Sequence, residues 1–208
     1  MYPPERIVCL TEETTETLYL LGEQDRIVGV SGYTVRPPQA RRDKPRVSAF
    51  ISADIPKILA LRPDLVLTFS DLRADIVASL IRAGVAVHAF NQRTVAEILG
   101  MVRTLGALVG AQDRASDLAN RLADNLEDTR RRAAQRSDRP KVYFEEWDEP
   151  MISGIAWVSE LIEAAGGTDI FPELAICKSA KDRIVTREEV IQRAPDIIVG
   201  SWCGKKFK

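Results

Sequence analysis

The stretch KILALRPDLVL (residues 57–67) and the stretch EVIQRAPDIIV (residues 189–199) decide the fold of this chain. Each has the spacing of a short amphipathic helix, then a Pro-Asp pair, then an apolar run typical of a strand. Proline disfavours helical backbone in the residue before it, so each helix is predicted to end at its Pro-Asp pair. The same order of elements therefore occurs twice.

A second pair of segments supports this duplication. TETLYLLGEQDRIV (residues 15–28) and SELIEAAGGTDIF (residues 159–171) share a helical spacing, a glycine that ends the helix and an apolar strand. Strands that alternate with helices are typical of parallel sheets. The chain is therefore predicted to be an α/β protein with two Rossmann-like halves of similar topology, each built on a parallel sheet.

The remaining elements follow from hydrophobic periodicity and turn residues. Strands are predicted at residues 6–10, 27–30, 65–69, 85–90, 142–144 and 197–200. Helices are predicted at residues 13–21, 55–61, 71–83 and 95–109, and residues 32–46 (GYTVRPPQARRDKPR) are predicted to be a loop.

A long charged stretch separates the two halves. Residues 111–138 are mostly polar but carry Leu118, Leu122 and Leu126 at helical spacing, which predicts one long helix. The predicted domains are an N-terminal lobe at 1–110, this spine helix at 111–138 and a C-terminal lobe at 139–208. Two lobes on one helix leave a cleft between them, and such a cleft is the usual place for a small ligand.

The composition excludes several classes of partner. The chain has 208 residues with 29 Lys and Arg against 30 Asp and Glu, so no basic excess is present to neutralise a nucleic acid. No apolar run approaches the roughly 18 residues of a membrane span. The first residues, MYPPERIVCLTEE, show no secretory signal, which leaves a cytoplasmic location open. Cys9, Cys177 and Cys203 are an odd number at wide spacing, which favours free thiols over a disulfide framework.

Candidate binding residues follow the predicted strands, because ligands of parallel α/β sheets bind at the carboxyl ends of the strands. Aromatic side chains recur at these ends, and their flat apolar faces suit a bulky ligand as well as ordinary packing. They are Tyr33, Phe50, Phe69, Trp147 and Trp202, with Trp157 at the head of a helix. We expect the first five to line one cleft between the lobes.

The sequence favours a binding protein over an enzyme. The one histidine, His88, lies in an apolar strand and has no evident partners for a catalytic triad or a zinc site. No glycine-rich phosphate motif is present. Glu145, Glu146 and Asp148 could act as acid/base groups, but successive residues of a strand point to opposite sides, so Glu145 and Glu146 would not both face the cleft. No catalytic residue, metal ligand or resident cofactor is predicted.

The residues also resemble a known family. PERIVCLTEETTETLYLLGEQDRIVGVSGY, the Pro-Pro pair at 37–38, both Pro-Asp stretches and the Ala-Gly-Gly at 165–167 are similar to substrate-binding proteins of cobalamin and ferric-siderophore ABC importers. The resemblance covers nearly the whole chain. It implies two lobes joined by one helix, a location in the periplasm or at the cell surface, and delivery of a ligand to a membrane permease. The family pattern continues beyond residue 208, so the C-terminal lobe is expected to be incomplete.

Within the family, the VSGYTVRPP segment and the aromatic residue after RVSA are most similar to the cobalamin branch. Cobalamin is therefore the first choice of ligand, and the alternatives are a ferric siderophore, haem, or a cytoplasmic role without a transporter. The residues expected to contact the ligand are Thr11, Glu12, Tyr33, Phe50, Phe69, Glu146, Trp147, Trp157, Trp202 and Cys203. Trp147 and Trp202 would form apolar walls, Thr11 or Glu146 would meet amide edges, and Cys203 is a lesser candidate for facing the metal.

The resemblance also implies one acidic residue on each lobe that meets arginines of the permease. The C-terminal position corresponds to Glu188, and the N-terminal position falls on Pro56, so Asp54 is the nearest substitute. Both acids would equally suit a helix start, where the macrodipole favours negative charge.

Overall fold

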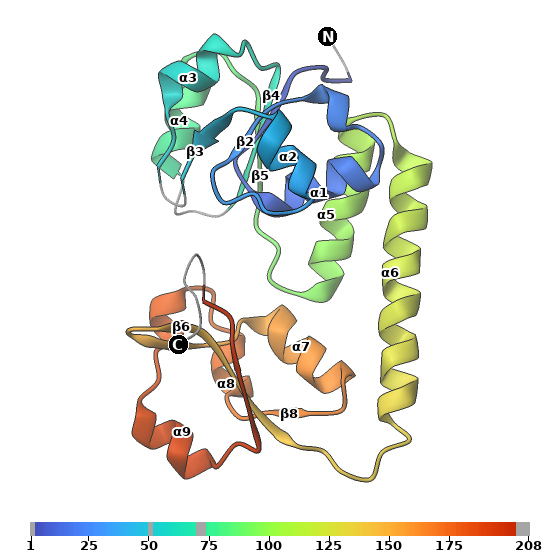
Figure 1. Cartoon of the computed structure of the whole chain (residues 1–208), viewed down its shortest axis with the longest axis vertical. Helices are drawn as coiled ribbons and strands as arrows, with labels where there is room; N and C mark the ends of the chain where they lie inside the picture. The colour runs from blue at the N-terminus through green and yellow to red at the C-terminus, as the bar shows by residue number, and fades with distance from the viewer. Residues whose placement is uncertain (1–2, 50–51, 70–73, 203–208) are drawn as a thin grey trace. The chain divides into compact units, whose positions relative to one another are not determined.

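The structure is a computed structural model that describes residues 3–49, 52–69 and 74–202 (Figure 1). By its contacts the chain forms two compact units. Unit 1 comprises Met1–Gln92 and Leu99–Asn120, and unit 2 comprises Arg93–Ile98 and Arg121–Lys208. One boundary lies just before α5 (Val95–Leu108), and the other two fall inside α5 and α6 (Gln112–Ala133).

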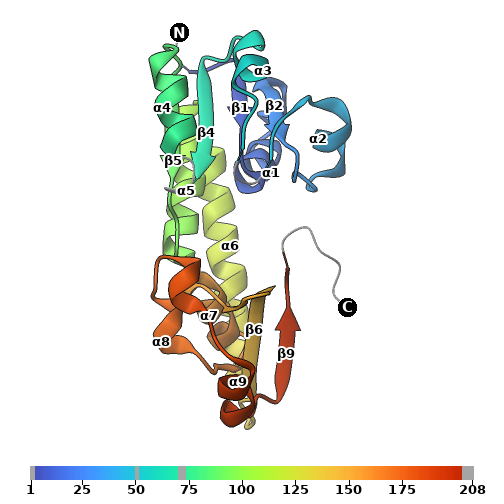
Figure 2. The same cartoon turned by 90° about the vertical axis from the view of Figure 1, so that its left-hand side faces the viewer.

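Unit 1 contains a five-stranded sheet whose strands are all parallel. The spatial order is β3-β2-β1-β4-β5 (Figures 1 and 2). The strands are β1 (Ile7–Cys9), β2 (Ile27–Ser31), β3 (Arg46–Ser48), β4 (Leu65–Phe69) and β5 (Val87–Phe90). The parallel α/β prediction is confirmed for this unit, and β3 is a strand that the sequence reasoning missed.

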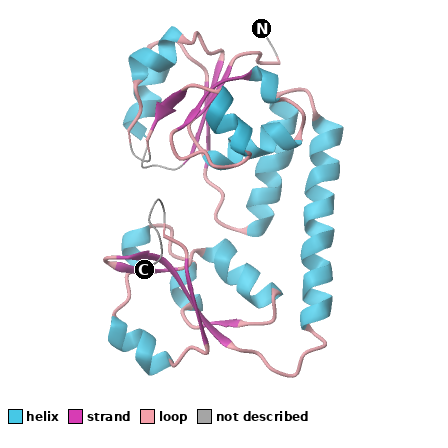
Figure 3. Ribbon diagram, in the orientation of Figure 1, coloured by secondary structure: helices cyan, strands magenta, loops and turns pink. Residues whose placement is uncertain are grey.

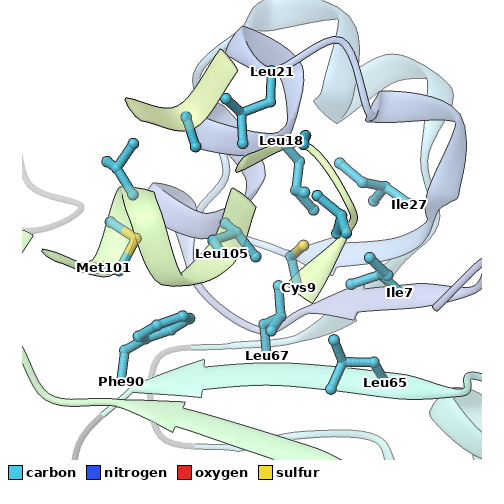
Figure 4. Packing of buried hydrophobic residues seen from close by; sticks show 14 of the residues in the cluster. Ile7, Cys9, Leu18, Leu21, Ile27, Leu65, Leu67, Phe90, Met101 and Leu105 are labelled. Atoms are coloured by element: carbon cyan, nitrogen blue, oxygen red, sulfur yellow. The ribbon is translucent and has the colours of Figure 1, made fainter. Parts of the chain in front are cut away.

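Helices pack on both faces of this sheet. They are α1 (Glu12–Leu20), α2 (Pro38–Asp43), α3 (Ile55–Ala60), α4 (Ala74–Arg82), α5 and α6, with a short 3-10 turn at Gln24–Arg26. Cys9 and Leu67 belong to a core with side chains of α1, α5 and α6, and Figure 4 shows Cys9 among Leu18, Leu67 and Leu105. Val8 and Val66 belong to a second core with α3 and α4. The alternation of faces along each strand produces this layered arrangement.

Unit 2 is built around β6 (Lys141–Asp148), which has three partner strands. β8 (Thr168–Asp169) and β9 (Ile197–Gly200) run parallel to it, whereas β7 (Met151–Ser153) is antiparallel and forms a hairpin with its end (Figure 3). The helices are α7 (Ala156–Ala164), α8 (Pro172–Ala175) and α9 (Arg187–Arg193), with a 3-10 turn at Ala180–Arg183. Residues Tyr143, Ile170, Phe171, Val185 and Val190 form its buried core.

The repeated Pro-Asp motif has the same geometry in both units. Arg62 and Ala194, which precede the two prolines, both have a φ of 48°, a left-handed conformation that ends the helix. Asp64 then accepts hydrogen bonds from the backbone N–H groups of Glu5 and Arg6 at 2.8 and 3.0 Å. Asp196 accepts one from the backbone N–H of Lys141 at 2.8 Å. Each aspartate therefore fixes the start of its own strand against the start of the neighbouring parallel strand.

A basic side chain completes the motif in each unit. Arg6 donates from Nη2 to the carbonyl oxygen of Leu61 at 2.6 Å, and Lys141 donates from Nζ to the carbonyl oxygen of Arg193 at 3.5 Å. These carbonyls are left unpaired by the end of α3 and of α9. The duplication seen in the sequence thus extends to the contacts that end the helices.

The second pair of similar segments is also confirmed. α1 and α7 are each followed by a glycine with positive φ, Gly22 at 73° and Gly166 at 86°, a conformation in which only glycine avoids steric strain. The strands that follow, β2 and β8, each run parallel to the first strand of their unit.

Four local predictions were wrong. β6 continues to Asp148 because its end pairs with β7, so residues 145–148 lie in a strand rather than after one. For the same reason the second sheet is mixed rather than purely parallel. The helix α6 ends at Ala133, before the turn-forming segment 137–140 (Ser-Asp-Arg-Pro), rather than at residue 138. The predicted loop at 32–46 contains α2, which begins at Pro38, where proline is favourable.

Candidate functional site

The candidate residues of unit 1 lie where the sequence places them, at or beyond the carboxyl ends of the strands. Tyr33 follows β2 and is 45% exposed, and Phe69 is the half-buried last residue of β4. Glu12 is the partly exposed first residue of α1. Phe50 lies outside the described residues. The exposed face of Tyr33 leaves it accessible to a ligand.

Thr11 belongs to a buried group of hydroxyls at the start of α1. Its hydroxyl lies 3.0 Å from that of Thr14, and its carbonyl oxygen accepts from the hydroxyls of Thr14 and Thr15. The hydroxyls of Thr14 and Thr15 also favour the Cys9 thiolate, but burial dominates and raises the pKa of Cys9 to about 12. Cys9 is therefore a buried neutral thiol, as predicted.

Glu13, the second residue of α1, has a raised carboxyl pKa. The main cause is desolvation, and the amide of Gln92, which donates at 3.4 Å, opposes it.

In unit 2, Trp202 is joined to Glu145, a residue that we did not select as a ligand contact from the sequence. The indole Nε1 of Trp202 donates to Oε1 of Glu145 at 3.0 Å. The other oxygen of this carboxylate accepts from the hydroxyl of Tyr143 at 3.2 Å. Burial, followed by the charge and hydrogen bond of Glu145, raises the pKa of Tyr143, so this hydroxyl stays protonated and acts as the donor.

Glu146 points to a different set of partners. Its carboxylate pairs with the guanidinium of Arg183 at 2.6 Å, and Arg183 is only 2% exposed. Arg183 also donates to the carbonyl oxygen of Ser153, whose hydroxyl donates back to the Arg183 carbonyl at 3.2 Å. The expectation that Glu145 and Glu146 do not share one side agrees with these separate partners. Glu146 therefore already neutralises a buried arginine, whatever else it contacts.

The other two tryptophans are partly buried. Trp147 lies within β6, and its indole Nε1 donates to the carbonyl oxygen of Glu149 at 2.9 Å. Trp157 is the second residue of α7, as predicted, and its backbone N–H donates to the carbonyl oxygen of Arg93 at 2.9 Å. Cys203 lies outside the described residues. That the aromatic side chains of both halves line one cleft stays a prediction.

The two acids proposed for docking are both exposed and both lie at helix starts. Asp54 caps α3 by accepting from the backbone N–H of Lys57 at 3.0 Å. Glu188 lies in the first turn of α9, where the capping box is formed by Thr186 and Glu189. Asp54 thus has a structural role in α3, and Glu188 makes no contribution to the cap.

The described part of the chain offers little for other chemistry. His88 lies in the edge strand β5 against the ring of Phe90, with the centroids 4.4 Å apart, and burial lowers its pKa. Among the described residues, no group of three or more His, Cys, Asp or Glu side chains could hold a metal ion. In the same residues, no helix is long and apolar enough to cross a membrane.

Comparison with known proteins assigns the family. The periplasmic binding protein family model matches residues 7–208. The vitamin B12-binding protein of Vibrio cholerae is 29% identical over 204 residues, which is 96% of this chain and 71% of that protein. The chain therefore belongs to the periplasmic binding protein family.

Solved structures agree with this assignment. The crystal structure of the periplasmic vitamin B12 binding protein BtuF of Vibrio cholerae has a TM-score of 0.77 at 26% identity, covering 96% of this chain and 77% of that one. A periplasmic heme binding protein from Pseudomonas aeruginosa has a TM-score of 0.82 at 20% identity, covering 98% and 74%, and at that identity it supports the fold alone. The predicted fold class and family resemblance are both confirmed.

Proposed function

We propose that this protein binds cobalamin non-covalently and delivers it to an ABC importer on the periplasmic or outer side of a membrane. The observation that carries the proposal is the 29% identity to a vitamin B12-binding protein over 96% of the chain. The released ligand is chemically unchanged, because the role of a family member is to bind rather than to react.

The side chains of unit 2 support a ligand of this class. Trp202 supplies a flat apolar surface at the end of β9, and Glu145 beside it supplies carboxylate oxygens. Corrinoids combine a broad, largely apolar ring with amide groups at its edge, so stacking and N–H acceptance are both useful in one place.

Titration calorimetry with cyanocobalamin tests the proposal directly. Replacing a buried aromatic contact costs roughly 1–3 kcal/mol, so Trp202→Ala should weaken binding by about tenfold or more. Ile176→Ala is the matched control, because Ile176 belongs to the same unit and is 79% exposed outside the candidate site. An absence of heat and of a thermal shift with cyanocobalamin, together with binding of haemin or a ferric siderophore, would replace cobalamin with that ligand.

Delivery to a permease is tested separately. In the proposal, Glu188 pairs with an arginine of the permease, and Asp54, which already caps α3, contributes a weaker contact. A pull-down with the permease encoded for this binding protein should lose most of its yield with Glu188→Ala and little with Glu163→Ala. Glu163 is a suitable control since it is an acid of unit 2 already paired with Arg139. Equal retention by both variants would remove Glu188 from the docking surface.

A further inference from the structure

Glu145 links Trp202 to the core of unit 2. Its carboxylate accepts from the indole Nε1 of Trp202 at 3.0 Å through one oxygen and from the Tyr143 hydroxyl at 3.2 Å through the other. Both oxygens are therefore engaged within the unit, each by a neutral donor. A carboxylate held at both oxygens by different elements has little rotational freedom left.

Tyr143 makes this anchor rigid. It is 1% exposed and packs edge-on against Phe171, with the ring centroids 5.9 Å apart. Phe171 is itself 1% exposed and carries the guanidinium of Arg193 over its ring at 4.1 Å. A side chain packed in this way occupies one rotamer, so the hydroxyl that donates to Glu145 has a fixed position.

The backbone fixes the same two residues a second time. Glu145 pairs with Gly200 across β6 and β9, and the N–H of Ser201 donates to the Glu145 carbonyl oxygen at 2.9 Å. Trp202 follows Ser201 and is the second residue after the end of β9. Glu145 therefore holds Trp202 in two ways, through the backbone of the preceding residues and through the hydrogen bond to the indole.

The adjacent carboxylate does not share this role. Glu146 is paired with the buried guanidinium of Arg183, which holds the segment before α9 against the β6–β7 hairpin. Glu145, in contrast, accepts a hydrogen bond from an aromatic side chain at the carboxyl end of the sheet, that of Trp202.

We propose that Glu145 is a positioning residue that fixes the orientation of the Trp202 indole at the carboxyl end of the second sheet. Its effect on ligand affinity rests on the proposed function, in which Trp202 forms a wall of the ligand site. In that role the carboxylate holds the ring in its binding orientation before the ligand arrives, so less conformational entropy is lost on binding.

The ligand-free protein provides the first test. In ¹⁵N-labelled protein the three tryptophans give three indole N–H signals, and Trp202→Phe identifies the signal of Trp202. Glu145→Ala should move this signal upfield and speed its hydrogen exchange, and Glu145→Gln should restore both, because the Gln carbonyl can accept the same hydrogen bond. The signal of Trp147, which donates to a backbone carbonyl, serves as the reference for an intact fold. An unchanged Trp202 signal in folded Glu145→Ala would overturn the proposal.

Cyanocobalamin affinity provides the second test. Glu145→Ala should weaken binding about tenfold, the effect expected from losing one hydrogen bond to a charged group, and Glu145→Gln should recover most of the loss. Unchanged affinity in Glu145→Ala, with the wild-type protein binding normally, would refute a role in ligand binding. If the wild-type protein does not bind cyanocobalamin, the proposed function is wrong, and the indole signals alone decide whether Glu145 positions Trp202.

Discussion

Substitution of Asp64 and Asp196 tests whether the repeated Pro-Asp motif stabilises each unit by the same contact. Asp64 accepts two backbone hydrogen bonds, whereas Asp196 accepts one and is exposed. A hydrogen bond of this kind contributes about 1 kcal/mol, as at a helix cap. Asp64→Ala should therefore lower the free energy of unfolding by about 2 kcal/mol and Asp196→Ala by about 1 kcal/mol.

Asparagine separates the two sites further. It keeps one carbonyl acceptor, so at residue 64 it should retain one of two bonds and at residue 196 its only bond. We expect Asp64→Asn to cost about 1 kcal/mol and Asp196→Asn close to nothing.

Urea unfolding measures these costs, and the tryptophans assign them to a unit. Trp147, Trp157 and Trp202 all belong to unit 2, so their fluorescence follows that unit, whereas circular dichroism follows both. The fluorescence midpoint should respond to Asp196→Ala. If the free energy of unfolding of both alanine variants lay within about 0.3 kcal/mol of the wild-type value, the aspartates of the motif would not stabilise the fold.

Two further predictions concern α5 and the start of α1. Gly106→Ala should lower the free energy of unfolding by about 2 kcal/mol, because its new Cβ would overlap that of Ala115. Gly100→Ala in the same helix meets open space and should raise the free energy of unfolding by about 0.5–1 kcal/mol. Thermal unfolding of both variants checks this, and equal effects would contradict it. Glu13 has a raised pKa, so its unfolded state ionises first and stability is lost as the pH rises from 4.5 through the folded-state pKa. Glu13→Gln should therefore raise the melting temperature at pH 7 and change it little below pH 4.5, and the same difference at both pH values would show that desolvation of Glu13 is not the cause.

Much of the fold could be predicted because its signals are local. The Pro-Asp pairs and the glycines after α1 and α7 impose backbone conformations that depend on residue type alone. Strands β1, β2, β4 and β5 of unit 1 are short apolar runs between such signals, and each was predicted within about two residues, as expected of boundaries drawn from one sequence. β3 was missed because Arg46–Ser48 alternates too briefly to show a period.

The β6–β7 hairpin could not be predicted in the same way. EEWDEP contains four acids and a proline, a composition typical of a loop, yet residues 145–148 are extended because β7 pairs along them and β9 pairs with Glu145 on the other side. Strand propensity depends on such neighbours more than on the residues themselves. The mixed second sheet follows from pairing that is invisible in the local sequence.

The choice between Glu145 and Glu146 shows where sequence reasoning about the site ended. Alternation along a strand predicted that only one of them would face the ligand, but it did not say which one. The structure shows that Glu146 is already engaged, because the Arg183 guanidinium, with 2% exposure, needs a carboxylate partner and Glu146 supplies it. Glu145 is then left to the neutral donors Tyr143 and Trp202, and its remaining lone pairs can accept from a ligand. The amide-accepting role that the sequence assigned to Thr11 or Glu146 stays a prediction, and we propose Glu145 as a further acceptor because it lies beside the Trp202 indole.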